Sequence, residues 1–201
     1  MRIAEKDMRP VIALQGSGAT SMQPLLAAIA ERLSRRGLRV VGVVENPPVG
    51  EIPCKSMELR SLENGQRFSI SQDLGPGSTA CNLSPEGLAL ACAAVQSAIA
   101  QGADIVVLSK FGKLEAAGEG LVDAFGTAIE RGLVVFTSVS PTIMAEWQAF
   151  AGDLAACVTV DPAQASDQAW LERSLDGWLD AWGLEAAARA AKREPKARIT
   201  A

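Results

Sequence analysis

A glycine-bearing turn between an apolar run and an amphipathic segment constrains this chain more than any other feature. Residues 10–14 form a short apolar run, typical of a strand buried on both faces. After the turn, apolar residues recur at helical spacing over residues 22–33, and Gly37 ends this pattern before a second apolar run at 39–45. Strand, glycine turn, helix and strand make a βαβ unit, which implies a parallel pair of strands and a right-handed crossover.

The turn reads ALQGSGAT over residues 13–20, which is the pattern of a phosphate-binding loop without its charge. In the motif GxxxxGK[ST] the lysine neutralises the β- and γ-phosphates, but here Ala19 takes that position and Ala13 takes the first glycine position. Backbone N–H groups at a helix N-terminus can still bind an anion without the lysine. The alternative is a tight strand-to-helix turn that binds no ligand. The candidate ligand-binding residues of the turn are Gly16, Ser17, Gly18, Thr20 and Ser21.

The rest of the chain continues the alternation of strands and helices. Further strands are expected at 104–109, 133–139 and 156–160, and further helices at 85–99, 121–131, 142–150 and 163–182. Between residues 47 and 83 the alternation breaks, and Asn64-Gly65 predicts a type I′ hairpin within an antiparallel excursion. The sequence therefore predicts a three-layer α/β sandwich with a mainly parallel sheet, as one domain over 1–184 followed by a basic helical or frayed tail at 185–201.

Ligands bind at the carboxyl ends of the strands in such sheets, and Lys110 and Lys113 follow one of these ends. Nucleoside triphosphatases usually carry an acidic residue there to hold Mg²⁺, whereas this chain has Ser109 and Lys110. The lysines could supply the positive charge that Ala19 lacks, or they could be solvated surface residues. Glu115 is a candidate general base, with an exposed helix-start residue as the alternative.

Two further candidate sites lie in the excursion between residues 47 and 83. A glycine-rich loop could form a second anion nest or a lid, or it could be a plain connection. Its candidate residues are Gln72, Asp73, Gly75, Gly77 and Ser78. Cys54 and Cys81 bracket the hairpin and could form a redox pair or bind a soft metal, although two thiolates make an incomplete zinc site.

Composition excludes several classes of function. The chain has no histidine and no tyrosine, which removes the Ser-His-Asp triad and the histidine metal ligand. Its net charge of −4 argues against a nucleic-acid partner. No apolar run approaches the length of a membrane span and the N-terminus has no apolar signal core, so we expect no membrane insertion and a cytoplasmic location.

Three blocks of the sequence carry a specific resemblance: CKSMELRSLENGQRFSISQDLGPGSTAC, SKFGKLEAAGEGL and WQAFAG. They resemble an uncharacterised bacterial domain-of-unknown-function family, found near molybdate-uptake genes and distantly similar to P-loop nucleoside triphosphatases. The shared pattern comprises Cys54, Met57, Gln72, Asp73, Leu74, Gly75, Gly77, Ser78, Cys81, Lys110, Phe111, Gly112, Lys113, Glu115, Gly118 and Gly120. The chain departs from the family at Ser109, Asn82 and Ser84, where asparagine, arginine and aspartate are usual.

The resemblance implies a link to molybdenum metabolism and supplies no reaction. Three functions stay open: a nucleotide- or oxyanion-binding protein with little or no hydrolysis, an unusual nucleoside triphosphatase or nucleotide-transferring enzyme that uses Lys110, and thiol-based metal handling by Cys54 and Cys81. The expected ligand is a small anion, either a nucleotide or a molybdate-like oxyanion. The expected macromolecular partners are a second copy of the chain or components of a molybdate transporter.

Overall fold

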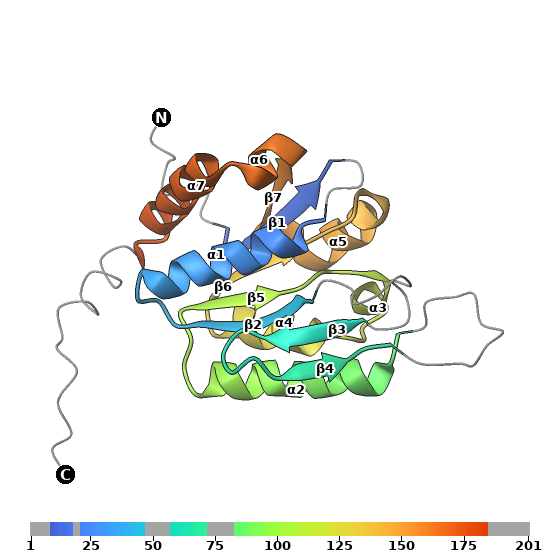
Figure 1. The fold of residues 1–201 in the computed structure, drawn as a ribbon. Coiled ribbons are helices and arrows are strands. Elements are labelled where there is room, and N and C mark those ends of the chain that lie inside the picture. Colours follow the sequence, from blue (N-terminus) through green and yellow to red (C-terminus); the bar gives the residue numbers. More distant parts are fainter. Residues whose placement is uncertain (1–8, 18–20, 47–56, 72–82, 185–201) are drawn as a thin grey trace, which may run out of the picture.

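Seven strands form one sheet in the order β4-β3-β2-β5-β6-β1-β7 (Figure 1). The structure is a computed structural model that describes residues 9–17, 21–46, 57–71 and 83–184. Strands β1, β2, β5, β6 and β7 run parallel, while β3 and β4 form an antiparallel hairpin beside β2. The strands are β1 Val11–Gly16, β2 Val40–Glu45, β3 Glu58–Ser61, β4 Arg67–Ser69, β5 Ile105–Leu108, β6 Val134–Ser138 and β7 Ala155–Val160.

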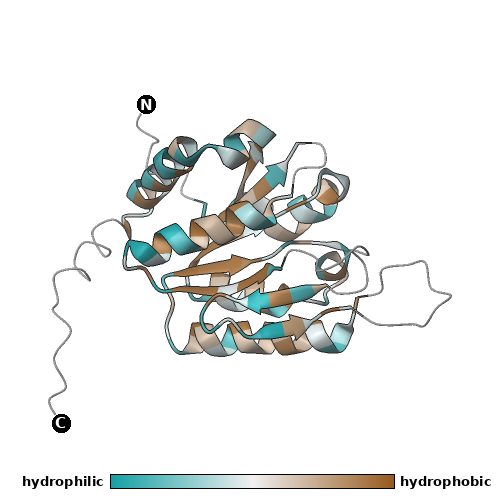
Figure 2. Cartoon of the chain, viewed as in Figure 1, coloured by the Kyte–Doolittle hydropathy of each residue, from teal (hydrophilic) through white to brown (hydrophobic). Residues whose placement is uncertain are grey.

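Helices cover both faces of the sheet, and this explains the apolar composition of its central strands. Every residue of β5 and β6 is buried, as Figure 2 shows for the hydrophobic centre of the molecule. On one face α1 (Gln23–Arg35) and α7 (Gln168–Ala181) pack over the sheet, and on the other α2 (Pro85–Ala100), α4 (Val122–Glu130) and α5 (Met144–Ala151) do so. The shorter helical elements are α3 Lys113–Ala116, η2 Pro141–Ile143, η3 Gly152–Leu154 and α6 Pro162–Ser166.

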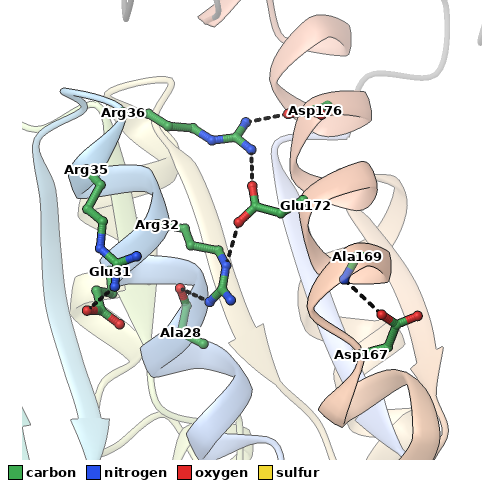
Figure 3. Close-up of polar contacts among 9 residues, drawn as sticks. All are labelled: Ala28, Glu31, Arg32, Arg35, Arg36, Asp167, Ala169, Glu172 and Asp176. Atoms are coloured by element: carbon green, nitrogen blue, oxygen red, sulfur yellow. Dashed lines mark hydrogen bonds and ion pairs between the residues drawn. The ribbon is translucent and has the colours of Figure 1, made fainter.

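An ion-pair network joins α1 to α7 on the outer surface (Figure 3). Glu172 accepts hydrogen bonds from Arg32 Nε at 2.7 Å and from Arg36 Nη2 at 2.6 Å, and Arg36 Nη1 also lies 2.7 Å from Asp176 Oδ1. The hydrogen bond from Arg36 lowers the pKa of the Glu172 carboxyl against the opposing effect of burial, and the bond from Arg32 lowers it further. Two cations and two anions therefore balance within the protein itself.

Two local predictions are wrong. The helix expected over 163–182 is divided, because Asp167 ends α6 and its carboxylate accepts the Ala169 N–H at 2.8 Å as the N-cap of α7. The hairpin is present but its turn is not type I′, which requires positive φ at both central residues. Gly65 has φ +73, Asn64 does not have positive φ, and the Ser61 N–H donates to Gln66 O across a four-residue connection.

The α/β class, the mainly parallel sheet between two helical layers and the antiparallel hairpin are all confirmed. The tail expected at 185–201 lies outside the described residues and stays a prediction. Ser84 caps α2, since its Oγ accepts the Gly87 N–H at 3.2 Å. Within the described part of the chain, no helix is long and apolar enough to cross a membrane.

Candidate functional site

A cleft of about 390 Å³ opens at the carboxyl ends of the parallel strands. We call it the strand-end cleft. Residues that end or follow β1, β2, β5 and β6 line it, together with the start of α1. Its lining residues are Gly16, Ser21, Met22, Gln23, Glu45, Lys110, Phe111, Gly112, Lys113, Ser138, Val139, Ser140, Pro141, Thr142 and Ile143.

The topology of the sheet explains why the cleft forms at this place. Strands β1 and β6 are neighbours, but α1 leaves β1 toward one face of the sheet while α5 follows β6 on the other face. The two connections diverge, and a crevice is left between them at the strand ends. In open α/β sheets this switch point is where ligands bind.

Gln23, in the first turn of α1, connects the ends of the strands below the cleft. Its side-chain amide donates to the Ser109 carbonyl at 2.7 Å, and its Oε1 accepts the Glu45 N–H at 2.9 Å. Ser138, at the end of β6, donates to the same Ser109 carbonyl at 2.8 Å. One glutamine therefore fixes the ends of β2 and β5 relative to α1, and thereby holds the floor of the cleft.

Residues 109–121, which we call the lysine loop, are anchored from below by Phe111. This side chain is 1% exposed, and its ring centroid lies 5.0 Å from that of Trp147 and 6.2 Å from that of Phe125. The Phe111 N–H donates to the Ser138 carbonyl at 2.8 Å, which extends the parallel pairing beyond β5 and β6. The two lysines on either side of Phe111 are thus carried by a segment built into the core.

Glu115 holds the same loop from within. Its two carboxylate oxygens accept the N–H of Gly112 at 2.8 Å and the N–H of Leu121 at 3.0 Å, and the residue is 6% exposed. Gly120 makes room for this carboxylate: its φ is +65, and a Cβ there would lie 2.2 Å from Glu115 Oε1. Glu115 is a helix-start residue, as the alternative to a general base proposed, because it lies in the first turn of α3 and caps it. Its expected exposure is wrong, since the turn buries it against backbone donors.

Positive charge on the cleft wall comes from Lys110 and Lys113. Lys110 Nζ lies 2.5 Å from Glu45 Oε1, in an ion pair whose side chains are 41% and 28% exposed. Lys113 is exposed and makes no ion pair within the described ranges of the chain. The described lining contains two ammonium groups and one carboxylate, so it carries an excess of positive charge.

Hydroxyl groups also line the cleft, in the segment after β6. Ser140 caps η2 by accepting the Thr142 N–H at 3.3 Å, and its Oγ lies 2.9 Å from Thr142 Oγ1. Ser21 contributes a third hydroxyl at the start of α1. Lysine ammonium and hydroxyl groups are donors that suit an oxyanion. Among the described residues, no three acidic or cysteine side chains form a group that could hold a metal ion.

The structure brings together part of the predicted site. Gly16, Ser21, Lys110 and Lys113 all line the strand-end cleft. Ser17 is occupied by a backbone hydrogen bond from its N–H to the Val160 carbonyl at 3.1 Å. Outside the described residues lie Gly18, Thr20, Cys54, Gln72, Asp73, Gly75, Gly77, Ser78 and Cys81, and for these the predictions stay predictions.

Sequence reasoning missed Gln23 altogether. It also gave no role to Glu45 or to residues 138–142. An amide in the first turn of the helix after the glycine turn is a weak signal, because a solvated glutamine is common there. Only the strand order reveals that its side chain meets Glu45 and Ser109, which are far apart in the sequence.

Comparison with known sequences gives the family of the chain and a more distant link. Residues 11–170 match the family described as a protein of unknown function, DUF2478. Over 152 residues, 75% of this chain, the sequence is 40% identical to a protein named molybdenum import ATP-binding protein ModC 2, from Bradyrhizobium diazoefficiens. The aligned segment is 17% of that relative's length, so the chain spans only a small part of it.

Two solved structures share the fold. THEP1 from the hyperthermophile Aquifex aeolicus superposes with a TM-score of 0.58 at 14% identity, over 83% of this chain and 97% of that chain. A human cancer-related nucleoside triphosphatase gives a TM-score of 0.59 at 15% identity, over 83% of this chain and 95% of that chain. At such identities the likeness shows the fold alone, which is similar to that of P-loop nucleoside triphosphatases. The chain belongs to the DUF2478 family.

Proposed function

We propose that the strand-end cleft binds a small anionic ligand, either a nucleotide or a tetrahedral oxyanion such as molybdate, with little or no hydrolysis. The observation that carries this proposal is the placement of Lys110 and Lys113 on an anchored loop at the switch point, in a cleft that hydroxyl donors also line. A preorganised excess of positive charge favours anions, because the donors need no rearrangement when the ligand arrives.

The same residues argue against efficient hydrolysis. Phosphoryl transfer depends almost entirely on positioned charge, which a P-loop lysine and a metal-holding acid normally supply. This chain has Ala19 in the first position and Ser109 in the second, and the Ser109 carbonyl is already bonded to Gln23 and Ser138. We expect turnover below about a thousandth of that of an ordinary nucleoside triphosphatase.

The 40% identical relative supports both the proposed class of ligand and a role in molybdenum uptake. It is named as an ATP-binding protein of molybdenum import, and a domain that senses a nucleotide or an oxyanion would fit such a system. We therefore propose an accessory role in molybdenum uptake or metabolism, with a component of molybdate transport as the partner.

The enzymatic alternative, in which Lys110 replaces the P-loop lysine and Glu115 orients water, finds less support. Both oxygens of Glu115 accept backbone N–H groups of the lysine loop. Glu115 also does not line the strand-end cleft. Thiol chemistry through Cys54 and Cys81 stays a prediction, and Cys54→Ala and Cys81→Ala variants that lose bound metal would support it.

A thermal-shift screen tests the proposal. The panel is ATP, GTP, molybdate, tungstate, sulfate and phosphate, each with wild type and with Lys113→Ala. A ligand at a hundred times its Kd stabilises the native state by about 2.7 kcal/mol, so modest affinity suffices to raise the Tm. We expect at least one anion to raise the Tm of wild type and to lose most of this effect with Lys113→Ala. If no anion shifts the Tm, or if the variant responds fully, the proposed site is wrong.

A further inference from the structure

We propose that Glu45 determines which anions the strand-end cleft accepts, and that it restricts the cleft to ligands with two or more negative charges. This inference rests on the proposed function, because it concerns how the same cleft discriminates among anions. It assigns Glu45 a role in ligand selection that goes beyond stabilising the end of β2.

Glu45 is placed so that any anion reaching Lys110 must compete with it. Its Oε1 lies 2.5 Å from Lys110 Nζ, and both residues line the cleft. The backbone N–H of Glu45 donates to Gln23 Oε1 at 2.9 Å, which fixes the main chain from which the carboxylate projects. The backbone of Lys110 is fixed as well, because the next residue, Phe111, is buried against Trp147.

The charge of the incoming anion decides whether it gains free energy by displacing Glu45 from Lys110. A singly charged anion that displaces Glu45 from Lys110 exchanges one negative partner for another, and it releases a carboxylate that must find solvent. An anion with two charges also has Lys113 as a partner, since Lys113 lines the same cleft and has no ion pair elsewhere in the described chain. Charge-assisted hydrogen bonds to both lysines exceed what Glu45 alone offers, so only the multiply charged ligand gains by displacing it.

The carboxylate can be removed without disturbing the floor of the cleft. The bond to Gln23 uses the Glu45 backbone, so Glu45→Gln keeps that bond, the side-chain shape and the strand pairing, and removes only the charge. Glu58→Gln is the matched control. Glu58 lies on the neighbouring strand β3 with a similar exposure of 31%, and it pairs with Arg67 at 3.5 Å instead of with Lys110.

The experiment is isothermal titration of wild type, Glu45→Gln and Glu58→Gln with molybdate, perrhenate and ATP. Molybdate and perrhenate are both tetrahedral oxyanions, and they carry two charges and one charge respectively. We expect wild type to bind molybdate or ATP and to bind perrhenate at least tenfold more weakly. Glu45→Gln should bind the multiply charged anion about two- to fivefold more tightly, which is the usual worth of a partly exposed ion pair. It should also bind perrhenate measurably, whereas Glu58→Gln should behave like wild type.

Two results overturn the inference while leaving the proposed function in place. One is a wild type that binds perrhenate as tightly as the other anions. The other is a Glu45→Gln variant whose affinities equal those of wild type or of Glu58→Gln. The first result is measured on wild type alone, so a folding defect in Glu45→Gln cannot obscure it. If none of the three anions binds any form of the protein, the proposed function fails and the inference fails with it.

Discussion

The ion-pair network between α1 and α7 and the strand-end cleft handle charge in opposite ways. In the network, Glu172 and Asp176 balance Arg32 and Arg36, and every charge has a partner within the protein. In the cleft, Glu45 balances one lysine, and Lys113 has no ion pair within the described residues. Charges balanced at one surface and an excess left at a preorganised cleft are the pattern expected if the cleft binds an anion, as we propose.

The two regions also differ in what holds their charged side chains in place. The network lies on helix surfaces, where solvent screens each pair and a single loss is tolerated. The lysines of the cleft stand on a loop whose shape depends on a buried carboxylate, a buried phenylalanine and a glycine with positive φ. The charges that we propose to bind the anion are thus exposed, while the residues that position them are buried.

Removing the carboxylate of Glu115 should lower the free energy of unfolding more than any other substitution proposed below. Glu115→Ala leaves the N–H groups of Gly112 and Leu121 without their acceptor, and the second of these is buried. We expect the free energy of unfolding to fall by about 2 to 4 kcal/mol, measured by urea denaturation. Glu119→Ala, an exposed glutamate in the same loop, should change it by less than about 0.5 kcal/mol. Equal effects of the two substitutions would show that Glu115 does not hold the loop.

Gln23→Ala should destabilise the floor of the cleft. It removes the hydrogen bonds to the Ser109 carbonyl and from the Glu45 N–H, at a partly buried position. The expected loss is about 1 to 2 kcal/mol of unfolding free energy, by the same denaturation measurement. Gln148→Ala, an exposed glutamine on α5, is the control and should have almost no effect. A loss for Gln148→Ala as large as that for Gln23→Ala would remove Gln23 from this role.

Lys113→Ala should weaken anion binding without weakening the fold. Its ammonium is exposed and makes no ion pair within the described residues, so the unfolding free energy should stay within about 0.5 kcal/mol of wild type. Affinity for the bound anion should fall about tenfold, the worth of one charge-assisted hydrogen bond. Arg173→Ala removes another exposed cation, on α7 and outside the cleft, and should leave the affinity unchanged. Similar losses with both variants would mean that only net charge matters.

Glu172→Gln should have the smallest effect, because Glu172 is 48% exposed and solvent screens its pairs. The expected loss at pH 7 is below about 1 kcal/mol. Since the folded-state pKa of Glu172 lies below its ordinary value of 4.5, its contribution is complete above that pH and disappears as the pH falls through the folded pKa. Denaturation at pH 7 and pH 3 should therefore show a difference between wild type and variant that shrinks in acid. A constant or growing difference would contradict this.

The sequence predicted the scaffold of the cleft better than its details. Apolar runs and helical spacing located the strands and the helices, and the rule for parallel sheets directed attention to Lys110 and Lys113. Both lysines line the cleft. What failed depends on contacts between distant residues: the burial of Glu115 comes from a turn closed by Leu121, and the pairing of Lys110 with Glu45 comes from the adjacency of β2 and β5.

The helix break at Asp167 was missed for another reason. Apolar residues continue at helical spacing on both sides of Asp167, so periodicity alone extends one helix through it. An aspartate within such a pattern can equally be a solvated helix residue or an N-cap, and its bond to the Ala169 N–H decides between the two. Capping depends on backbone geometry that the pattern of apolar residues does not contain.

The central claim is that the cleft binds an anion without efficient turnover, and one paired measurement tests it most directly. ATP with Mg²⁺ is titrated into the protein by calorimetry, with molybdate in parallel, and phosphate release is followed at saturating ATP. We expect saturable binding of at least one of the two anions and phosphate release below about a thousandth of an ordinary nucleoside triphosphatase rate. Mg²⁺-dependent hydrolysis at an ordinary rate, abolished by Lys110→Ala, would contradict it.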